Sequence, residues 1–274
     1  MPELPEVETV KSYVGNKITY KKIINIKVLN TKLRWPIDRA NIKKIIGKKI
    51  LKVDRRGKYI LLQFEGISES IIIHLGMTGV ISFTTAADYN IHKHDHLLMY
   101  FEGCVLVYSD VRKFGSIHIT DDVSNMFLIK GLGPEPMSED FNADYLYEKS
   151  KNRKCTIKEL IMNQKIVVGI GNIYASESLF LSKIHPATIV NRISRAQFRR
   201  IITNVQFVLS KAISMGGSTI RDFLNAEGKP GYFAQELLVY KKKYCTIHKK
   251  NLISNLKIAG RSSFYCNKCQ KEKL

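Results

Sequence analysis

The stretch Gly131-Leu-Gly-Pro-Glu-Pro-Met-Ser-Glu-Asp-Phe141 separates two parts of the chain that have different hydrophobic patterns. Its glycines and prolines interrupt regular secondary structure, so the stretch is typical of a connection between domains. Residues 20–120, on its N-terminal side, contain short apolar runs divided by polar turns, which predicts antiparallel strands in a sandwich or barrel. On its C-terminal side the apolar residues recur with helical spacing. The sequence therefore predicts an α+β protein with more than one domain.

The predicted strands come in pairs around short turns, whereas the predicted helices follow one another. We expect strand pairs within residues 48–64, 68–83 and 94–110. We expect helices within residues 2–14, 138–149, 154–163, 172–183 and 194–217. The last helix should stop at Gly216-Gly217, because consecutive glycines end a helix. From about residue 240 a small basic segment with several cysteines closes the chain.

The charge of the chain favours a polyanionic partner. It has 44 Lys and Arg residues against 24 Asp and Glu residues, a formal net charge of +20, and the basic residues are spread along the chain. A folded protein with this charge attracts nucleic acid first and anionic membranes second, although a general enrichment in lysine gives the same count. The apolar runs are too short for a membrane span, and the acidic start differs from a signal peptide. We therefore expect a cytoplasmic protein without a membrane partner.

Three of the five cysteines lie within the last 30 residues, which favours a metal site over a disulfide framework. Two residues separate Cys245 from His248 and Cys266 from Cys269, and 17 residues lie between the two pairs. Each pair fits a knuckle that supplies two ligands to one tetrahedral Zn²⁺, and three cysteines with one histidine are an accepted ligand set. The alternative is a surface histidine beside unrelated cysteines. So short a segment lacks a core of its own, and one structural zinc would supply its stability.

Seven motifs occur along the chain in an order that one enzyme family shares. They are PELPEVET from residue 2, HLGMTG from 74, DVRKFG from 110, LGPEP from 132, GIGNIYASESLF from 169, GGSTIRDF from 216 and GRSSFYC from 260. With these motifs the chain resembles bacterial formamidopyrimidine-DNA glycosylase from residue 2 to residue 270. The resemblance implies an N-terminal β-sandwich over residues 1–133, a helical domain with a helix-two-turn-helix over 134–238, and a β-hairpin zinc finger over 239–274.

The same resemblance implies an activity. Enzymes of this family remove oxidised purines, namely 8-oxoguanine and formamidopyrimidines, from double-stranded DNA, and they nick the strand at the resulting abasic site by β,δ-elimination. The family works as a monomer in the bacterial cytoplasm, associated with the nucleoid. Its finger usually has four cysteines, so His248 is a departure from the pattern, and we expect zinc binding to survive it.

Four catalytic residues follow from the resemblance. Once Met1 is removed, Pro2 presents a secondary amine, and a chain-terminal amine with a pKa of about 8 is partly unprotonated and nucleophilic at neutral pH. Pro2 is therefore expected to form a Schiff base with the sugar C1′, and Glu3 to protonate the sugar as its ring opens. Lys58 is expected to assist β-elimination and to contact the DNA backbone. Arg261, near the tip of the predicted hairpin, is expected to assist δ-elimination and to bind phosphate.

Other residues are implied to hold the DNA. A damaged base has to leave the duplex before it is excised, and the gap has to be filled. Met77, Arg112 and Phe114 match the gap-filling positions, where apolar side chains replace lost stacking and the arginine bonds the orphaned base; for Met77 and Phe114 the alternative is the core of the sandwich. Residues 219–240 match a segment that closes over the extruded base. Further DNA contacts are implied for His94, Arg153, Lys158 and Asn172.

Two other functions stay open on the sequence. One is an endonuclease VIII-like glycosylase for oxidised pyrimidines, against which the DVRKFG motif and the long segment at residues 219–240 favour purines. The other is a non-catalytic zinc protein that binds nucleic acid. Such a protein would have no use for Pro2 next to Glu3, or for Lys58.

Overall fold

The computed structural model describes residues 1–218 and 232–271. They form two compact units, one of which holds Met1–Lys130 and residues 216–218. The other unit holds Gly131–Met215 and residues 232–271, so the helices and the Cys-bearing hairpin belong together. The first unit ends where the Gly- and Pro-rich stretch begins. The individual domain limits at residues 133 and 238 stay predictions.

The first helix, α1 (Leu4–Ile18), forms because apolar residues return at every third or fourth position. Its buried face consists of Val7, Val10, Val14 and Ile18. Glu3 is the N-cap, and Pro5 occupies the first turn, where its missing N–H costs no hydrogen bond. The helix runs beyond the predicted end at residue 14 because Ile18 continues the apolar face.

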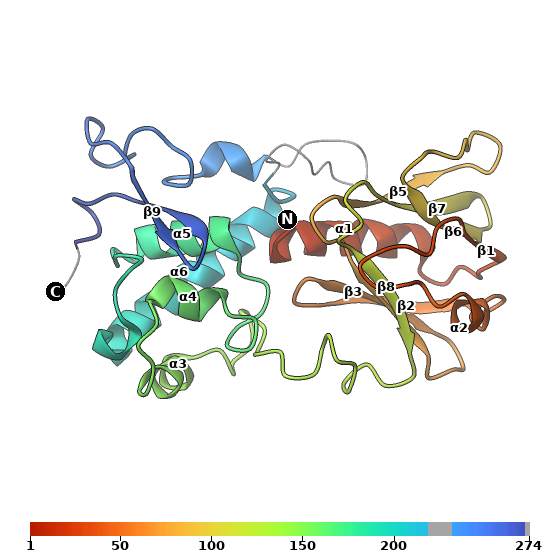
Figure 1. Ribbon diagram of the computed structural model, residues 1–274, viewed down its shortest axis with the longest axis horizontal. Coiled ribbons are helices and arrows are strands. Elements are labelled where there is room, and N and C mark those ends of the chain that lie inside the picture. The colour runs from red at the N-terminus through yellow and green to blue at the C-terminus, as the bar shows by residue number, and fades with distance from the viewer. Residues whose placement is uncertain (219–231, 272–274) are drawn as a thin grey trace. The chain divides into compact units, whose positions relative to one another are not determined.

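Two four-stranded antiparallel sheets make up most of the first unit (Figure 1). One sheet has the order β1-β6-β7-β5, formed by β1 (Asn25–Val28), β6 (Asp95–Phe101), β7 (Cys104–Asp110) and β5 (Gly79–Thr84). The other has the order β2-β3-β4-β8, formed by β2 (Ile50–Arg56), β3 (Tyr59–Phe64), β4 (Ser70–His74) and β8 (Ser116–Thr120). Apolar side chains from both sheets and from α1 share one core. This arrangement confirms the predicted β-sandwich.

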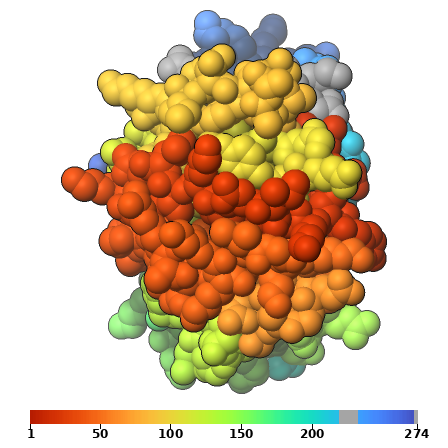
Figure 2. Space-filling model, turned by 90° about the vertical axis from the view of Figure 1, so that its right-hand side faces the viewer, coloured from red at the N-terminus to blue at the C-terminus, as the bar shows by residue number. Residues whose placement is uncertain are grey.

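A short helix, α2 (Arg39–Lys43), lies between β1 and β2 in the chain. Asp38 caps it, because its carboxylate accepts the N–H groups of Ala40 and Asn41 at 3.0 Å each. Figure 2 shows the first unit from the side of α2 and β1, where the red and orange early part of the chain makes the surface. This part contains the lysine-rich stretch at residues 43–52.

The connection between β4 and β5 differs from the prediction for residues 68–83. Both strands exist, but β4 pairs with β3 and β8, whereas β5 pairs with β7. Residues 75–78 therefore carry the chain from one sheet to the other, and residues 111–115 carry it back from β7 to β8. Apolar alternation identifies a strand without identifying its partner, so the change of sheet cannot be seen in the sequence. The two other predicted pairs, β2-β3 and β6-β7, are hairpins.

Helices dominate the second unit. Its described residues contain α3 (Ala143–Ser150), α4 (Ile157–Met162), α5 (Asn172–Leu181), α6 (Arg195–Ser214) and short 3-10 helices at Val190–Arg192 and Phe233–Glu236. The predicted start of α3 at residue 138 is wrong, because the side chain of Asn142 accepts the N–H of Tyr145 and caps the helix there. The predicted stop of α6 is confirmed, since Gly216 has a φ of +75°. No helix in the described ranges is long and apolar enough to span a membrane.

The C-terminal hairpin consists of β9 (Ser254–Ile258) and β10 (Arg261–Tyr265). The segment that leads into it is fixed by Glu177 of α5, which is 2% exposed. The Glu177 carboxylate accepts the N–H groups of residues 238, 239 and 240 at 2.8, 3.0 and 2.8 Å. Burial raises the pKa of Glu177, although these three hydrogen bonds act in the opposite direction. One buried carboxylate thus ties the hairpin segment to the helices.

Candidate functional site

The start of α1 places two predicted catalytic residues in a buried setting. Pro2 is buried and Glu3 is 3% exposed. The backbone N–H of Glu3 donates to Oε2 of Glu6 at 2.8 Å. Oε1 of Glu6 accepts the N–H of Ser218 at 2.8 Å and its hydroxyl at 3.0 Å. Glu6 thereby fixes the backbone of Glu3 and joins it to Ser218; most of the segment predicted to close over an extruded base follows at residues 219–231, outside the described residues.

Lys58 lies in the turn between β2 and β3 and is 6% exposed. Arg55 ties this turn to α1, because its Nε donates to Glu8 at 2.6 Å and its Nη1 donates to the carbonyl of Gly57 at 2.9 Å. Burial raises the pKa of Glu8, but Arg55 and Lys11 outweigh it, so this pKa lies below its ordinary value. The Lys58 turn and the helix that carries Pro2 and Glu3 are therefore held together by a charged hydrogen bond.

His74, a residue that sequence reasoning did not single out, lies beside the Lys58 turn. It is the last residue of β4, and its ring centroid is 5.0 Å from that of Tyr59. Burial, followed by the positive charges of Lys58 and Arg34, lowers the pKa of His74 from 6.5 to about 4. His74 is therefore neutral near pH 7, and Lys58 and Arg34 carry the positive charge there. The sequence signal that could have identified His74 is its position directly before the LGMTG stretch, which belongs to a family motif.

Met77, Arg112 and Phe114 lie on the two crossings between the sheets. Met77 is 37% exposed and Phe114 is 46% exposed, so neither belongs to the core. The guanidinium carbon of Arg112 lies 4.8 Å from the ring centroid of Phe114, within the range of a cation–π contact. Lys113, between them, has a φ of +57°, which turns the chain sharply. The two apolar side chains and the arginine are thus presented outward by neighbouring turns.

The histidines at residues 92–96 differ in their surroundings. His94, the predicted DNA contact, is partly buried, and its carbonyl accepts the N–H of Asp110 at 3.0 Å. His96 is fully buried, and its Nε2 lies 2.9 Å from the carbonyl of Asp110. His96 therefore has no access to DNA, whereas His94 keeps a partly open side chain. Arg153 is exposed in the turn after α3.

Lys158 and Asn172 are brought together in the second unit. Lys158 is only 1% exposed, and its amine donates to Oδ1 of Asn172 at 2.5 Å. It also donates to the carbonyl of Ser262 at 3.0 Å and to the hydroxyl of Ser263 at 2.7 Å. Asn172 is the first residue of α5 after the N-cap Gly171, so its side chain does not cap the helix. The buried lysine links α4, the start of α5 and the hairpin, and its predicted contact with DNA stays a prediction.

Arg261 begins β10 directly after the turn at Ala259 and Gly260, which have φ of +46° and +76°. It is exposed, at the end of the hairpin, as the sequence predicts. A pocket in the second unit is lined by Lys158, Glu159, Met162, Asn163, Ile258, Ala259 and Arg261. The buried amine and the exposed guanidinium therefore line the same depression.

The four predicted metal ligands converge. Their ligand atoms all lie within 4.8 Å of one another. The sulfurs of Cys245 and Cys269 are 3.7 Å apart, and Nδ1 of His248 lies 3.9, 3.9 and 3.2 Å from the sulfurs of Cys245, Cys266 and Cys269. A tetrahedral zinc with usual bond lengths sets sulfur–sulfur separations of about 3.8 Å and sulfur–nitrogen separations of about 3.6 Å. The donor set and its spacing therefore fit one Zn²⁺, with His248 in the place of a cysteine.

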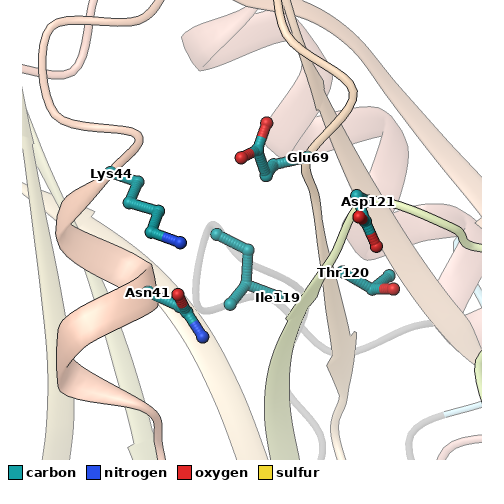
Figure 3. Close-up of a pocket in the computed structure, with 6 residues that line it drawn as sticks. All are labelled: Asn41, Lys44, Glu69, Ile119, Thr120 and Asp121. Carbon is teal, nitrogen blue, oxygen red and sulfur yellow. The ribbon is translucent and has the colours of Figure 1, made fainter.

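A pocket on the first unit holds none of the predicted site residues. Figure 3 shows its lining, which consists of Asn41, Lys44, Glu69, Ile119, Thr120 and Asp121. Lys44 is basic, and the carboxylates of Glu69, just before β4, and Asp121, just after β8, lie apart from each other. The lining of this pocket offers no converging set of metal ligands.

Comparisons with known proteins match nearly the whole chain to one enzyme family. A model of the formamidopyrimidine-DNA glycosylase N-terminal domain matches residues 1–117, and a model of the formamidopyrimidine-DNA glycosylase H2TH domain matches residues 132–224. The formamidopyrimidine-DNA glycosylase of Teredinibacter turnerae is 42% identical and covers 98% of this chain and 100% of its own.

Two solved structures of the Lactococcus lactis enzyme are also similar, each with 37% identity and a TM-score of 0.90. One is a complex with DNA that contains an abasic site, and it covers 98% of this chain and 100% of its own. The other is a mutant bound to DNA that contains Fapy-dG, with a coverage of 99% and 100%. Together with the two family models, these matches show that the chain belongs to the formamidopyrimidine-DNA glycosylase family.

Proposed function

We propose that this chain excises oxidised purines from double-stranded DNA in base-excision repair and then nicks the strand at the abasic site. The observation that carries the proposal is the buried Pro2–Glu3 start of a helix that Arg55 ties to the Lys58 turn. Family membership and the net charge of +20 support a DNA substrate. The Lactococcus lactis relatives, solved with DNA that carries a formamidopyrimidine or an abasic site, support the substrate class.

Pro2 performs the first chemical step once Met1 has been removed. Its secondary amine forms a bond to C1′ of the damaged nucleotide, while the bond between C1′ and the base breaks. The electron pair of that bond leaves with the base, which takes up the proton that the amine loses. Glu3 gives a proton to the ring oxygen as the sugar opens, which leaves an iminium at C1′. A secondary amine yields this cation without a further proton. The iminium withdraws electrons and makes the hydrogens on C2′ acidic.

Strand cleavage follows from the iminium. Loss of a proton from C2′ expels the 3′ phosphate, and a second loss of a proton, from C4′, expels the 5′ phosphate. Lys58 places a positive charge at the first of these steps and contacts the backbone. Arg261 binds phosphate and gives a proton in the second step. Water then hydrolyses the iminium, which frees the Pro2 amine and releases the sugar fragment. The other product is a one-nucleotide gap with phosphate on both sides.

The lesion reaches Pro2 only after it has left the duplex. Met77 and Phe114 replace the lost stacking, and Arg112 bonds the base that has lost its partner. Met77 is 37% exposed and Phe114 is 46% exposed, which supports a gap-filling role for both side chains. Asn172, His94 and Arg153 contact the DNA backbone elsewhere. Lys158 fixes the Asn172 side chain by a hydrogen bond to its Oδ1. One structural Zn²⁺ stabilises the hairpin that presents Arg261.

The first test is capture of the covalent intermediate. Processed protein is mixed with a duplex that contains 8-oxoguanine opposite cytosine, and borohydride reduces the iminium to a stable protein–DNA adduct. Protein sequencing has to show Pro2 as the first residue of the sample. Pro2→Gly, which keeps a terminal amine but makes it primary, should give the adduct more slowly. A variant with one extra residue before Pro2, whose proline nitrogen is an amide, should give none. The matched control Pro5→Ala changes a proline in the first turn of the same helix and should give the adduct. If all variants form the adduct equally, the proposed mechanism is wrong.

The lesion class needs its own test. Parallel single-turnover assays on 8-oxoguanine and thymine-glycol duplexes compare a purine with a pyrimidine lesion. We expect faster excision of 8-oxoguanine. Faster excision of thymine glycol would replace the purine assignment with that of an endonuclease VIII-like enzyme, and would leave the Pro2 chemistry unaffected.

A further inference from the structure

The two crossings between the sheets touch each other through their backbones. Gly76 has a φ of +60°, and a Cβ at this position would clash with the backbone of Phe114 and Gly115, lying 2.5 Å from the carbonyl carbon of Phe114. A Cβ at Gly115 would clash with the hydroxyl of Tyr108 and lie 2.7 Å from the carbonyl of His74. Only glycine permits so close an approach. The turn with Met77 and the turn with Phe114 are therefore one packed body.

A single buried carboxylate lies at the centre of this body. Asp110, the last residue of β7, is fully buried. Its Oδ1 accepts the hydroxyl of Thr78 at 2.6 Å and the N–H of Arg112 at 3.2 Å. Its Oδ2 accepts the N–H of Gly115 at 2.8 Å. The hydroxyl of Thr78 also accepts the N–H of Arg112 at 3.0 Å, so the two turns are joined a second time.

Each bond ends next to one of the gap-filling side chains. Thr78 follows Met77, the Arg112 bond is made by that residue itself, and Gly115 follows Phe114. We propose that Asp110 is a positioning residue that holds these three side chains in the geometry needed to enter the duplex. The inference rests on the proposed function, because it assigns a task to residues that matter only if a base is extruded. Asp110 itself does not touch the DNA.

The chemistry of the contacts requires a carboxylate. Three donors converge on two oxygens, and hydrogen bonds to an ionised acceptor are about twice as strong as neutral ones. Asparagine has the same shape, but its NH₂ group would face either the N–H of Gly115 or the donors from Thr78 and Arg112. One of the two turns would then lose its anchor. Asp110→Asn therefore changes the hold on the turns with little change in packing.

The experiment compares two substrates that need the gap-filling side chains to different degrees. Excision of 8-oxoguanine paired with cytosine requires a stacked base to be displaced, whereas a preformed abasic site offers Pro2 a sugar without a base to extrude. For Asp110→Asn we expect about a tenfold slower single-turnover excision, the usual effect of losing a hydrogen bond to a charged group. Nicking at the abasic site should change less than about threefold. The fluorescence of 2-aminopurine opposite the lesion should also rise less on binding.

Two further sets of variants complete the test. Thr78→Val should reproduce the selective loss, and Thr78→Ser, which keeps the hydroxyl, should restore wild-type excision. Asp95→Asn is the matched control, because Asp95 is a buried aspartate of the adjoining strand that accepts the Ser109 hydroxyl and the His92 N–H. It should lower the melting temperature without changing the ratio of excision to nicking.

The outcomes separate the inference from the proposed function. If the wild-type protein neither excises the lesion nor nicks the abasic site, the proposed function fails and this inference fails with it. If the wild-type protein does both, equal losses on the two substrates for Asp110→Asn would mean a merely structural residue and would overturn the inference. Wild-type behaviour of Asp110→Asn and Thr78→Val would overturn it as well. Should Asp110→Asn not fold, the comparison of Thr78→Val with Thr78→Ser decides.

Discussion

Acidification should weaken the fold of the first unit through His74. The pKa of His74 is lowered from 6.5 to about 4, first by burial and then by the charges of Lys58 and Arg34. At a pH between these two pKa values the unfolded chain binds a proton at His74 that the folded protein does not bind. The free energy of unfolding therefore falls as the pH falls. The contribution of neutral His74 is complete above pH 6.5 and is lost progressively down to about pH 4.

The size of the effect follows from the difference between the two pKa values. A difference of about 2.5 corresponds to roughly 3 kcal/mol in the free energy of unfolding. At pH 5 the unfolded state has bound most of its proton and the folded state little, so about 2 kcal/mol is already lost relative to pH 7. His118, whose pKa is also lowered by burial, acts in the same direction. The wild-type loss therefore exceeds the share of His74, and a variant is needed to isolate that share.

Urea unfolding at pH 7 and pH 5 measures this effect. Trp35 is the only tryptophan of the chain, and its ring packs against Phe127 at 5.5 Å, so its fluorescence reports the first unit. The loss of stability between the two pH values should be about 2 kcal/mol smaller in His74→Gln than in the wild type. Equal losses in the two proteins, or an NMR titration of the His74 ring near pH 6.5, would refute the reasoning.

Three further outcomes are expected. A strong chelator should release one zinc per chain and unfold the hairpin, as a colorimetric zinc assay and circular dichroism would show. His248→Cys should retain the metal, while His248→Ala should bind it more weakly. An undisturbed hairpin in the chelated protein would contradict the zinc assignment. Glu177→Gln should lower the free energy of unfolding by about 1–3 kcal/mol, because an amide NH₂ would face backbone donors; Glu148→Gln, at an exposed position of α3, serves as control in the same denaturation experiment. With roughly six phosphate contacts, the logarithm of DNA affinity should fall with the logarithm of salt concentration at a slope of about −5, measured by fluorescence anisotropy, and a nearly flat dependence would exclude the proposed binding mode.

The fold was largely predictable because its elements have strong local signals. Residues close together in the chain determine the apolar face of α1, the hairpins β2-β3 and β6-β7, and the end of α6 before Gly216. The change of sheet between β4 and β5 has no such signal, since alternation along a strand is the same whichever sheet the strand joins. The late start of α3 follows from one side chain, Asn142, which competes for the helix terminus.

The candidate site was predictable to the extent that its chemistry depends on residue type and spacing. The metal cluster is the clearest case, because four ligands on two knuckles leave few arrangements in space. The roles of the catalytic and DNA-binding residues came from the family motifs and stay predictions. Burial could not be read from the sequence: Lys158 looks like a surface lysine on a short helix, yet its amine is enclosed by the hairpin and Asn172.

Buried carboxylates connect the fold to the charge of the surface. Among the described residues, three buried carboxylates accept backbone N–H groups from other segments. Glu6 accepts the N–H of residue 218, Asp110 that of residue 115 on a crossing between the sheets, and Glu177 that of residue 239 before the hairpin. A carboxylate suits this use because it has only acceptors, so it can satisfy several donors at once. The same choice removes negative charge from the surface, since five acidic residues of the described chain are buried but only two basic ones. The side chains exposed to solvent are therefore more basic than the composition alone indicates, and these are the groups that DNA would contact.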